Sequence, residues 1–247
     1  MHIFLTSSPF GDYRSSKPAP FIGWNPNNSF LRNISSCWKE NAHILYVAAD
    51  PWNYSLNNQI QHDFRIKFLE SKLSFCEIDI CDYRYQMHSQ LNYYDVIILG
   101  GGHVPTQNRF LKEINLPQEI QDFSGIVIGI SAGSMNCAKL VYAQPEEQGE
   151  TRIPHEQRFI SGLAITNVNV LPHYNATKND YVDNLRLYED ITFSDSYHHS
   201  FIVLEDGSYI YQKDGRPFLF GTGYQIKDGQ MKRICQNEEF IDLEKFI

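Results

Sequence analysis

The chain has 247 residues and a formal net charge of −8, with 42% hydrophobic and 20% charged residues. This length and composition are typical of a globular protein, and they suffice for a single α/β domain over residues 1–247 with a full hydrophobic core. The negative charge and the lack of any basic run argue against a nucleic-acid or membrane partner, because both would favour a basic face.

The N-terminal segment 1–8 has neither a basic n-region nor a long apolar h-region, so we expect a first strand there and not a signal peptide. The apolar runs further along the chain are too short to cross a bilayer. The five cysteines are scattered and form no C-x-x-C pair, which favours reduced thiols over disulfides or a zinc site. Together these features predict a cytoplasmic protein.

The first half of the chain alternates near-continuously apolar strands with amphipathic helices. The expected strands are residues 3–5, 43–49, 75–80, 94–99 and 125–130, and the expected helices are residues 30–39, 60–71 and 108–114. This alternation predicts a doubly wound, mainly parallel sheet with helices on both faces. Ligands of such sheets bind at the C-terminal ends of the strands.

Residues 9–28 are rich in Pro, Asn, Ser and Gly, and they are predicted to form a long loop. Loops of this length are often functional lids, and a surface insertion is the alternative. The aromatic residues available to cover a pocket are Phe10, Tyr13, Phe21 and Trp24.

The last third of the chain has shorter and less regular elements. We expect strands at residues 167–171, 201–204, 208–211 and 218–220, and a helix at residues 179–188. Asp206-Gly207 and Asp214-Gly215 are typical of tight hairpin turns. This part is therefore predicted to extend the sheet with antiparallel strands.

The strand at 125–130 runs directly into Gly129-Ile-Ser131-Ala-Gly133, a G-x-S-x-G motif, and small residues at helical spacing follow as far as Val141. A serine on so tight a turn needs neighbours without a Cβ atom. The turn also aims the first helical N–H groups at the group that the serine attacks. We predict that Ser131 is a nucleophile, against the alternative of a structural turn, and that Cys137 on the same helix packs in the core.

A serine nucleophile needs a general base within hydrogen-bond reach. Of the nine histidines, His173 is the best placed, because it follows a predicted strand and sits on a turn shaped by proline. His103, directly after a glycine run, and the pair His198 and His199 are the alternatives.

The acid that would orient this base stays open in the sequence. Asp206 lies in a turn after a strand, and its neighbour Glu205 is nearly as well placed. Glu146 and Glu147, in the segment after the Ser131 helix, are further alternatives. An Asp before Gly also serves ordinary turn chemistry, so the pattern alone does not select it.

The backbone N–H of Ala132 and one from the glycine run at residues 100–102 are the natural donors to an oxyanion. Gly100-Gly-Gly-His103-Val-Pro does not complete G-x-G-x-x-G, and no P-loop lysine follows it. No H-E-x-x-H motif occurs either. The sequence therefore predicts neither a cofactor nor a metal.

Several motifs resemble the peptidase E and cyanophycinase group of serine peptidases, whose fold is like that of the class I glutamine amidotransferases. The matching segments, in the family's order and with similar spacing, are Thr6-Ser-Ser8, Leu99-Gly-Gly-Gly-His103, Gly129-Ile-Ser-Ala-Gly-Ser-Met-Asn136, Leu171-Pro-His-Tyr174 and Leu204-Glu-Asp-Gly-Ser-Tyr-Ile210.

The resemblance implies Ser131 as nucleophile, His173 as base, and an oxyanion held by Ala132 with Gly101 or Gly102. The family's acid falls on Asp206, and another assignment in the family falls on Glu146 or Glu147. The resemblance favours Asp206, because its turn context matches better, with Glu146 and Glu147 as the alternatives. Peptidase E recognises its substrate with a Gly-Glu-Thr-Arg segment. This chain has Tyr181-Val-Asp-Asn-Leu-Arg186 there, which places Arg186 as a loose match to the family's arginine. Arg186, together with His103 after the glycine run, is an expected substrate-binding side chain.

The expected activity is a serine-type hydrolase that cleaves a small peptide or amide, with Asp-X dipeptides as one candidate substrate. An α/β-hydrolase esterase is one alternative, and it would pair His198 or His199 with Asp190 or Asp195. A catalytically silent amidotransferase-like binding domain is the other. The expected partner is a small peptide, and a homodimer is compatible with the sequence.

Overall fold

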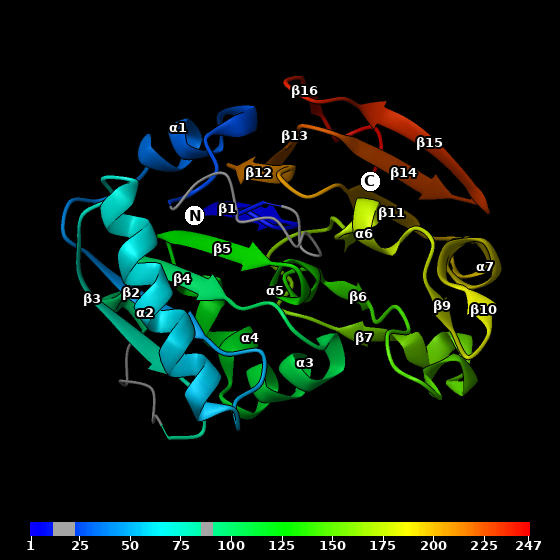
Figure 1. Ribbon diagram of the computed structural model, residues 1–247, viewed down its shortest axis with the longest axis horizontal. Helices are drawn as coiled ribbons and strands as arrows, with labels where there is room; N and C mark the ends of the chain where they lie inside the picture. Colours follow the sequence, from blue (N-terminus) through cyan, green and yellow to red (C-terminus); the bar gives the residue numbers. More distant parts are fainter. Residues whose placement is uncertain (12–22, 85–90) are drawn as a thin grey trace.

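The computed structural model describes residues 1–11, 23–84 and 91–247. A large sheet runs through the protein, with its strands in the order β16-β13-β12-β1-β5-β4-β2-β3 (Figure 1). Its strands are β1 (His2–Thr6), β2 (Ala42–Val47), β3 (Phe75–Cys81), β4 (Val96–Leu99), β5 (Ile126–Ile130), β12 (Tyr209–Lys213), β13 (Arg216–Phe220) and β16 (Phe240–Asp242). The strands β1 to β5 pair in parallel, whereas β12, β13 and β16 extend the sheet antiparallel beyond β1.

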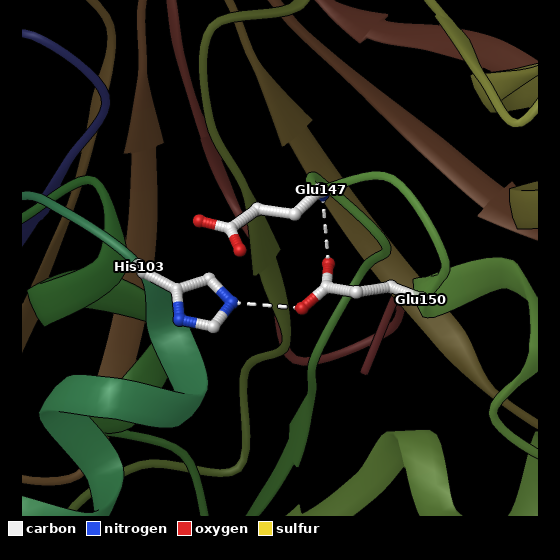
Figure 2. A group of neighbouring side chains, drawn as sticks. All are labelled: His103, Glu147 and Glu150. Atoms are coloured by element: carbon white, nitrogen blue, oxygen red, sulfur yellow. Dashed lines mark hydrogen bonds and ion pairs between the residues drawn. The ribbon is translucent and has the colours of Figure 1, made fainter.

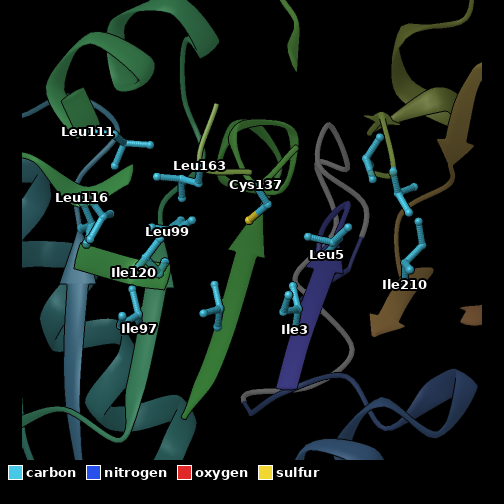
Figure 3. Close-up of a cluster of buried hydrophobic side chains, with 14 of the residues drawn as sticks. Ile3, Leu5, Ile97, Leu99, Leu111, Leu116, Ile120, Cys137, Leu163 and Ile210 are labelled. Atoms are coloured by element: carbon cyan, nitrogen blue, oxygen red, sulfur yellow. The ribbon is translucent and has the colours of Figure 1, made fainter. Parts of the chain in front are cut away.

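Helices cover both faces of this sheet (Figure 1). Strand side chains alternate between the two faces, so Ile98 packs on one side and Leu99 on the other. The face with Ile98 is covered by α1 (Phe30–Ser35) and α2 (Tyr54–Glu70). The opposite face is covered by α3 (Val104–Glu113), α4 (Leu116–Glu119) and the 3₁₀ turn η3 (Ile120–Asp122), and Figure 3 shows the apolar side chains that meet there. Each fully buried Leu or Ile contributes about 1.5–3 kcal/mol to this core.

A second sheet lies beside the first, in the order β15-β14-β11-β8. It consists of β8 (Val170–Leu171), β11 (Ser200–Leu204), β14 (Gly223–Lys227) and β15 (Gln230–Cys235). The strands β8 and β11 pair in parallel, with Val203 opposite Leu171, so both strands end at the same edge. This pairing brings residues 172 and 205 onward close together.

The remaining elements are short. They are the strands β6 (Leu140–Tyr142), β7 (Phe159–Ser161), β9 (Tyr181–Val182) and β10 (Leu185–Arg186), the helices α5 (Ala132–Asn136), α6 (Tyr174–Thr177) and α7 (Phe193–Asp195), the π-helical turn η6 (Leu187–Thr192), and the 3₁₀ turns η1 (Asn27–Ser29), η2 (Leu91–Tyr93), η4 (Glu150–Arg152) and η5 (His155–Arg158). No helix in the described ranges has both the length and the apolar character needed to cross a bilayer.

The predicted fold class is confirmed, and most predicted elements of the first half exist with shifted ends. The helix predicted at 60–71 begins at Tyr54, because the Asn53 side chain caps it by accepting the Leu56 N–H at 3.2 Å. The helix predicted at 108–114 begins at Val104, where Pro105 suits the first turn.

Three predictions for the later segments are wrong. The helix after Ser131 ends at Asn136, and Val141 lies in β6. The helix predicted at 179–188 is replaced by the hairpin β9–β10 and η6, because Asp183 and Asn184 both take positive φ and make a tight turn. Asp206-Gly207 does not close a hairpin, since β11 and β12 belong to different sheets. Asp214-Gly215 does close one, between β12 and β13.

The predicted long loop at 9–28 is described only in part. Phe10 lines a cavity, whereas Trp24 is 1% exposed and packs in the core against α2. Tyr13 and Phe21 lie outside the described residues. The hypothesis of a lid stays a prediction.

Gly133 shows how closely α5 packs on the sheet. A Cβ atom at this position would lie 2.2 Å from the backbone oxygen of Leu99 in β4. We expect Gly133→Ala to lower the free energy of unfolding by about 2–3 kcal/mol, although alanine favours a helix, because the clash is with backbone that cannot move aside. Urea unfolding measures this, with exposed Lys112→Ala in α3 as a control that should shift by less than about 0.5 kcal/mol. A Gly133→Ala protein as stable as the wild type would contradict the packing described.

Candidate active site

A cavity of about 890 Å³ opens at the C-terminal ends of the strands. It is lined by residues that follow β1, β4, β5 and β8 and by two later segments: Ser7, Ser8, Phe10, Gly101, Gly102, His103, Ile130, Ser131, Met135, Gln144, Pro145, Glu146, Glu147, Pro172, His173, Thr177, Asp180, Tyr181, Val182 and Leu187. This is the edge where ligands of parallel sheets bind. The cavity brings together most of the residues singled out in the sequence.

Ser131 occupies the turn between β5 and α5 in a strained conformation, with φ of 52° and ψ of −114°. Backbone strain of this kind costs about 1–3 kcal/mol and persists only where the surroundings hold it. Here the Ser131 N–H donates to the Thr6 oxygen of β1 at 3.0 Å, and the Ser134 hydroxyl donates to the same oxygen at 2.8 Å. A Cβ atom on Gly129 would lie 2.6 Å from the Ser134 Cα atom, so the first glycine of the motif is required for this turn.

Backbone N–H groups of two loops converge beside Ser131. Gly101, after β4, lies so close that an added Cβ atom would be 3.3 Å from the Ser131 Cβ atom. The N–H groups of Gly101, Gly102 and Ala132 donate no hydrogen bond to any other residue in the described ranges. Unsatisfied N–H groups next to a serine form the arrangement that stabilises a developing oxyanion.

His173 follows β8 and bonds with Asp206, which follows β11. The His173 Nδ1 and Asp206 Oδ1 atoms are 2.7 Å apart, and the two side chains are only 10% and 2% exposed. A carboxylate only accepts, so Nδ1 carries the proton of this bond. His173 has φ of 60° at the start of α6, a conformation that a bulky residue adopts only when its surroundings fix it.

Ser7, which the sequence reasoning noted only as part of Thr6-Ser-Ser8, fixes this pair. Its hydroxyl donates to Asp206 Oδ1 at 2.7 Å and accepts the His173 backbone N–H, also at 2.7 Å. Ser7 is fully buried at the end of β1. Ser7, which follows a strand of the large sheet, thereby bonds to both His173 and Asp206, which follow strands of the second sheet.

A buried network of amide side chains, also missed in the sequence, joins α5 to α3. Asn136 accepts from Asn108 at 2.9 Å and donates to the Gln107 oxygen at 3.0 Å. Gln107 in turn donates to the Gly100 oxygen at 2.8 Å. This network holds the glycine loop in place relative to the helix that begins after Ser131.

His103, Glu147 and Glu150 form an acidic cluster beside the glycine loop (Figure 2). The His103 ring donates from Nε2 to Glu150 at 2.9 Å, and its Nδ1 is 2.8 Å from the Thr106 hydroxyl. Glu150 also accepts the backbone N–H groups of Glu146 and Glu147, which lowers the pKa of its carboxyl together with His103 despite partial burial. Glu150 had no role in the sequence-based prediction.

Glu146 carries an unusual carboxyl at the cavity rim. The residue is exposed overall, but the cavity wall reduces the solvation of its carboxyl and raises its pKa to about 7, with Glu150 and Glu147 adding to the rise and His103 opposing it. Neither Glu146 nor Glu147 has a recorded bond with His173, whereas Asp206 does. The two alternative acids therefore lie at the cavity without reaching the histidine as Asp206 does.

Arg186 is not brought to the site. It lies on exposed β10, outside the cavity lining, and its guanidinium pairs with Asp190 at 2.6 Å. His198 and His199 are not among the lining residues either, and His199 stacks on Phe159 at 4.0 Å. The prediction that Arg186 contacts substrate, and the pairing required for an α/β-hydrolase esterase, therefore have no support in this geometry.

Fold and site together define a class: a doubly wound α/β protein that holds a strained serine at the C-terminal edge of its sheet, in one cavity with a histidine that bonds with a buried aspartate. The model of peptidase family S51 matches residues 29–219, well over half of the chain. The chain belongs to peptidase family S51, a family of serine-type peptidases, and the resemblance predicted from the sequence is confirmed.

Solved structures agree on the fold. A peptidase from an acI-B1 actinobacterium is similar with a TM-score of 0.61 at 17% identity, covering 98% of this chain and 96% of that one. A candidate peptidase E protein from Listeria monocytogenes EGD-e is similar with a TM-score of 0.52 at 14% identity, covering 95% and 98%. No curated protein sequence matches the chain.

Proposed function

We propose that the protein hydrolyses a small peptide or amide through an acyl-enzyme formed on Ser131, with His173 as general base and Asp206 as the orienting acid. The observation that carries this proposal is the buried 2.7 Å bond between Asp206 and His173, because His173 lines the cavity that also holds strained Ser131. Membership of a serine peptidase family supports the same chemistry.

The steps follow from the donors and acceptors present. His173 Nε2 takes the Ser131 hydroxyl proton while Oγ attacks the carbonyl carbon, and Asp206 stabilises the imidazolium that forms. The N–H groups of Ala132 and of Gly101 or Gly102 hold the oxyanion. His173 then gives its proton to the leaving amine, and a water activated by the same ring releases the acyl group.

All five cysteines are free, and Cys81, Cys137 and Cys235 are buried. Unpaired thiols support the proposal of a cytoplasmic enzyme. Cys137 is fully buried on the last turn after α5 and bonds weakly to the Gly133 oxygen, so it packs and does not face the cavity.

A fluorophosphonate probe tests the proposed activity directly. Ser131 should displace fluoride from the probe, and intact-mass analysis should show one added phosphonyl group on the wild-type protein. Peptide mapping should place this group on Ser131. The absence of labelling, under conditions where a known serine hydrolase reacts, would count against the proposal and favour a silent binding domain.

The orienting acid is tested by a comparison of carboxylates. We expect Asp206→Asn to lower kcat by about 10⁴-fold, because the amide holds His173 in the wrong tautomer. Glu146→Gln should cost far less, since Glu146 has no recorded bond with His173. Asp190→Asn, outside the cavity, serves as the control and should stay within about threefold of the wild type. A larger loss in Glu146→Gln than in Asp206→Asn would transfer the role to Glu146.

A further inference from the structure

The charged side chains of the described cavity wall, its histidines aside, are all carboxylates. The acidic side chains that line it are Glu146, Glu147 and Asp180, and the described part of the wall contains no lysine or arginine. Arg186, the cation expected from the sequence, is paired with Asp190 outside the lining. A wall of this charge attracts cations and repels a carboxylate.

The acidic cluster lies close to the serine. Gly101 lies within contact distance of Ser131. His103 is two residues further along the chain, so the Cα atoms of Gly101 and His103 are at most about 7 Å apart. Each of His103, Glu147 and Glu150 offers a ligand atom within 4.8 Å of those of the other two (Figure 2). Glu146 and Glu147 line the same cavity as Ser131, so their carboxylates can meet a substrate that Ser131 attacks.

The carboxylates of the acidic cluster and of neighbouring Glu146 differ in how many hydrogen bonds and ion pairs they form. Glu150 already accepts two backbone N–H groups and the His103 ring. The Glu146 and Glu147 carboxylates accept no hydrogen bond and form no ion pair with any described residue. Burial of its carboxyl raises the pKa of Glu146, and the nearby Glu150 and Glu147 add to the rise; a bound cation would stabilise the charged form.

The hydrogen bonds of His103 favour an organic cation over a metal ion. Ionised Glu150 can only accept, so the His103 Nε2 atom carries the proton of the 2.9 Å bond and has no lone pair to offer. His103 Nδ1 is occupied by Thr106. A metal bound through either ring nitrogen would have to displace one of these bonds, whereas an ammonium or guanidinium group can donate directly to Glu147 and Glu146.

We propose that Glu146 and Glu147 bind a positively charged group of the substrate close to the cleaved bond, and that the cavity rejects an acidic residue at that place. The group that these carboxylates would bind is a positively charged N–H donor. It can come from a lysine or arginine side chain at the cleaved bond, or from a free amino terminus about two residues before it. This inference rests on the proposed peptidase function, and it excludes Asp-X dipeptides as preferred substrates.

Matched fluorogenic peptides test the inference. The residue before the cleaved bond is lysine, norleucine or aspartate, and each peptide is made with a free and with an acetylated amino terminus. We expect kcat/KM for the lysine peptide to exceed that for norleucine by about tenfold and that for aspartate by about 100-fold. This lysine preference, present in both series, would identify the side chain as the cation. If the amino terminus is the cation, lysine and norleucine peptides should be cleaved alike, and acetylation should lower kcat/KM of both by about tenfold. Equal rates for lysine and norleucine with no effect of acetylation, or a preference for aspartate, would overturn the proposal.

Variants of the wall provide the second measurement. In Glu146→Gln/Glu147→Gln the ratio of lysine to norleucine rates should fall to near one, and Glu147→Lys should shift the preference toward aspartate. Exposed Glu156→Gln, which lies outside the lining, should keep the wild-type ratio. A preference that disappears with EDTA and returns with zinc or manganese would instead assign the cluster to a metal.

The two proposals fail in different ways. If fluorophosphonate labels Ser131 but the peptide series shows no charge preference, only the cation inference is wrong. If Ser131 is not labelled and no peptide is cleaved, the proposed function itself is wrong.

Discussion

Ser131→Ala should lower peptide hydrolysis by about 10⁶-fold and abolish fluorophosphonate labelling, because loss of the nucleophile removes the covalent step altogether. The variant should remain folded. The Ser131 side chain makes no hydrogen bond with any residue that the structure describes, and the bonds that hold the turn join its backbone to Thr6, Ser134 and Met135.

Intact-mass analysis after probe treatment, together with a thermal melt, measures both parts of this expectation. Ser194→Ala, at an exposed serine outside the cavity lining, is the matched control and should label like the wild type. Labelling that persists in Ser131→Ala would assign the nucleophile to another residue.

His173→Ala should lower hydrolysis to a similar extent, about 10⁶-fold, because the serine and histidine of such a site act as one unit. The double variant with Ser131→Ala should therefore lose little more than either single variant, and this non-additivity is the signature of a shared step. Steady-state kinetics with the best substrate measures all three proteins.

His199→Ala is the control for His173→Ala. The His199 ring stacks on Phe159, and burial together with nearby His155 lowers its pKa, so it is a packed aromatic ring outside the cavity. Activity should survive its removal. If activity disappears in His199→Ala and persists in His173→Ala, the site is that of an α/β-hydrolase esterase.

The sequence predicted the parts of the site that depend on local patterns. Ser131 lies in a motif whose strand, turn and glycines are contiguous, so the local chain dictates the turn. The alternation of apolar strands and helices likewise predicted the doubly wound sheet, because each buried strand is recognisable by itself.

The parts that depend on distant contacts were missed or misplaced. Ser7 resembles any serine after a strand until β1 is placed between β5 and β12. Arg186 matched a family segment by position, but its guanidinium forms an ion pair with Asp190, four residues later in the chain. The assignment of β11 to a second sheet, which decides where Asp206 lies, depends on its pairing with β8 and on no local signal. Such contacts are properties of the folded chain.

The bond between Ser7 and Asp206 joins residues 199 positions apart, and it has a consequence for synthesis. The large sheet cannot gain β12 beside β1, and His173 cannot gain its carboxylate, until the chain has grown well past position 206. At about 5–20 residues per second, Asp206 is added about 4–15 s after Ser131. The proposed proteolytic centre therefore stays unassembled until most of the chain has been synthesised. Until then a nascent chain carries Ser131 without its complete set of partners, and it poses no hazard of cleaving neighbouring proteins.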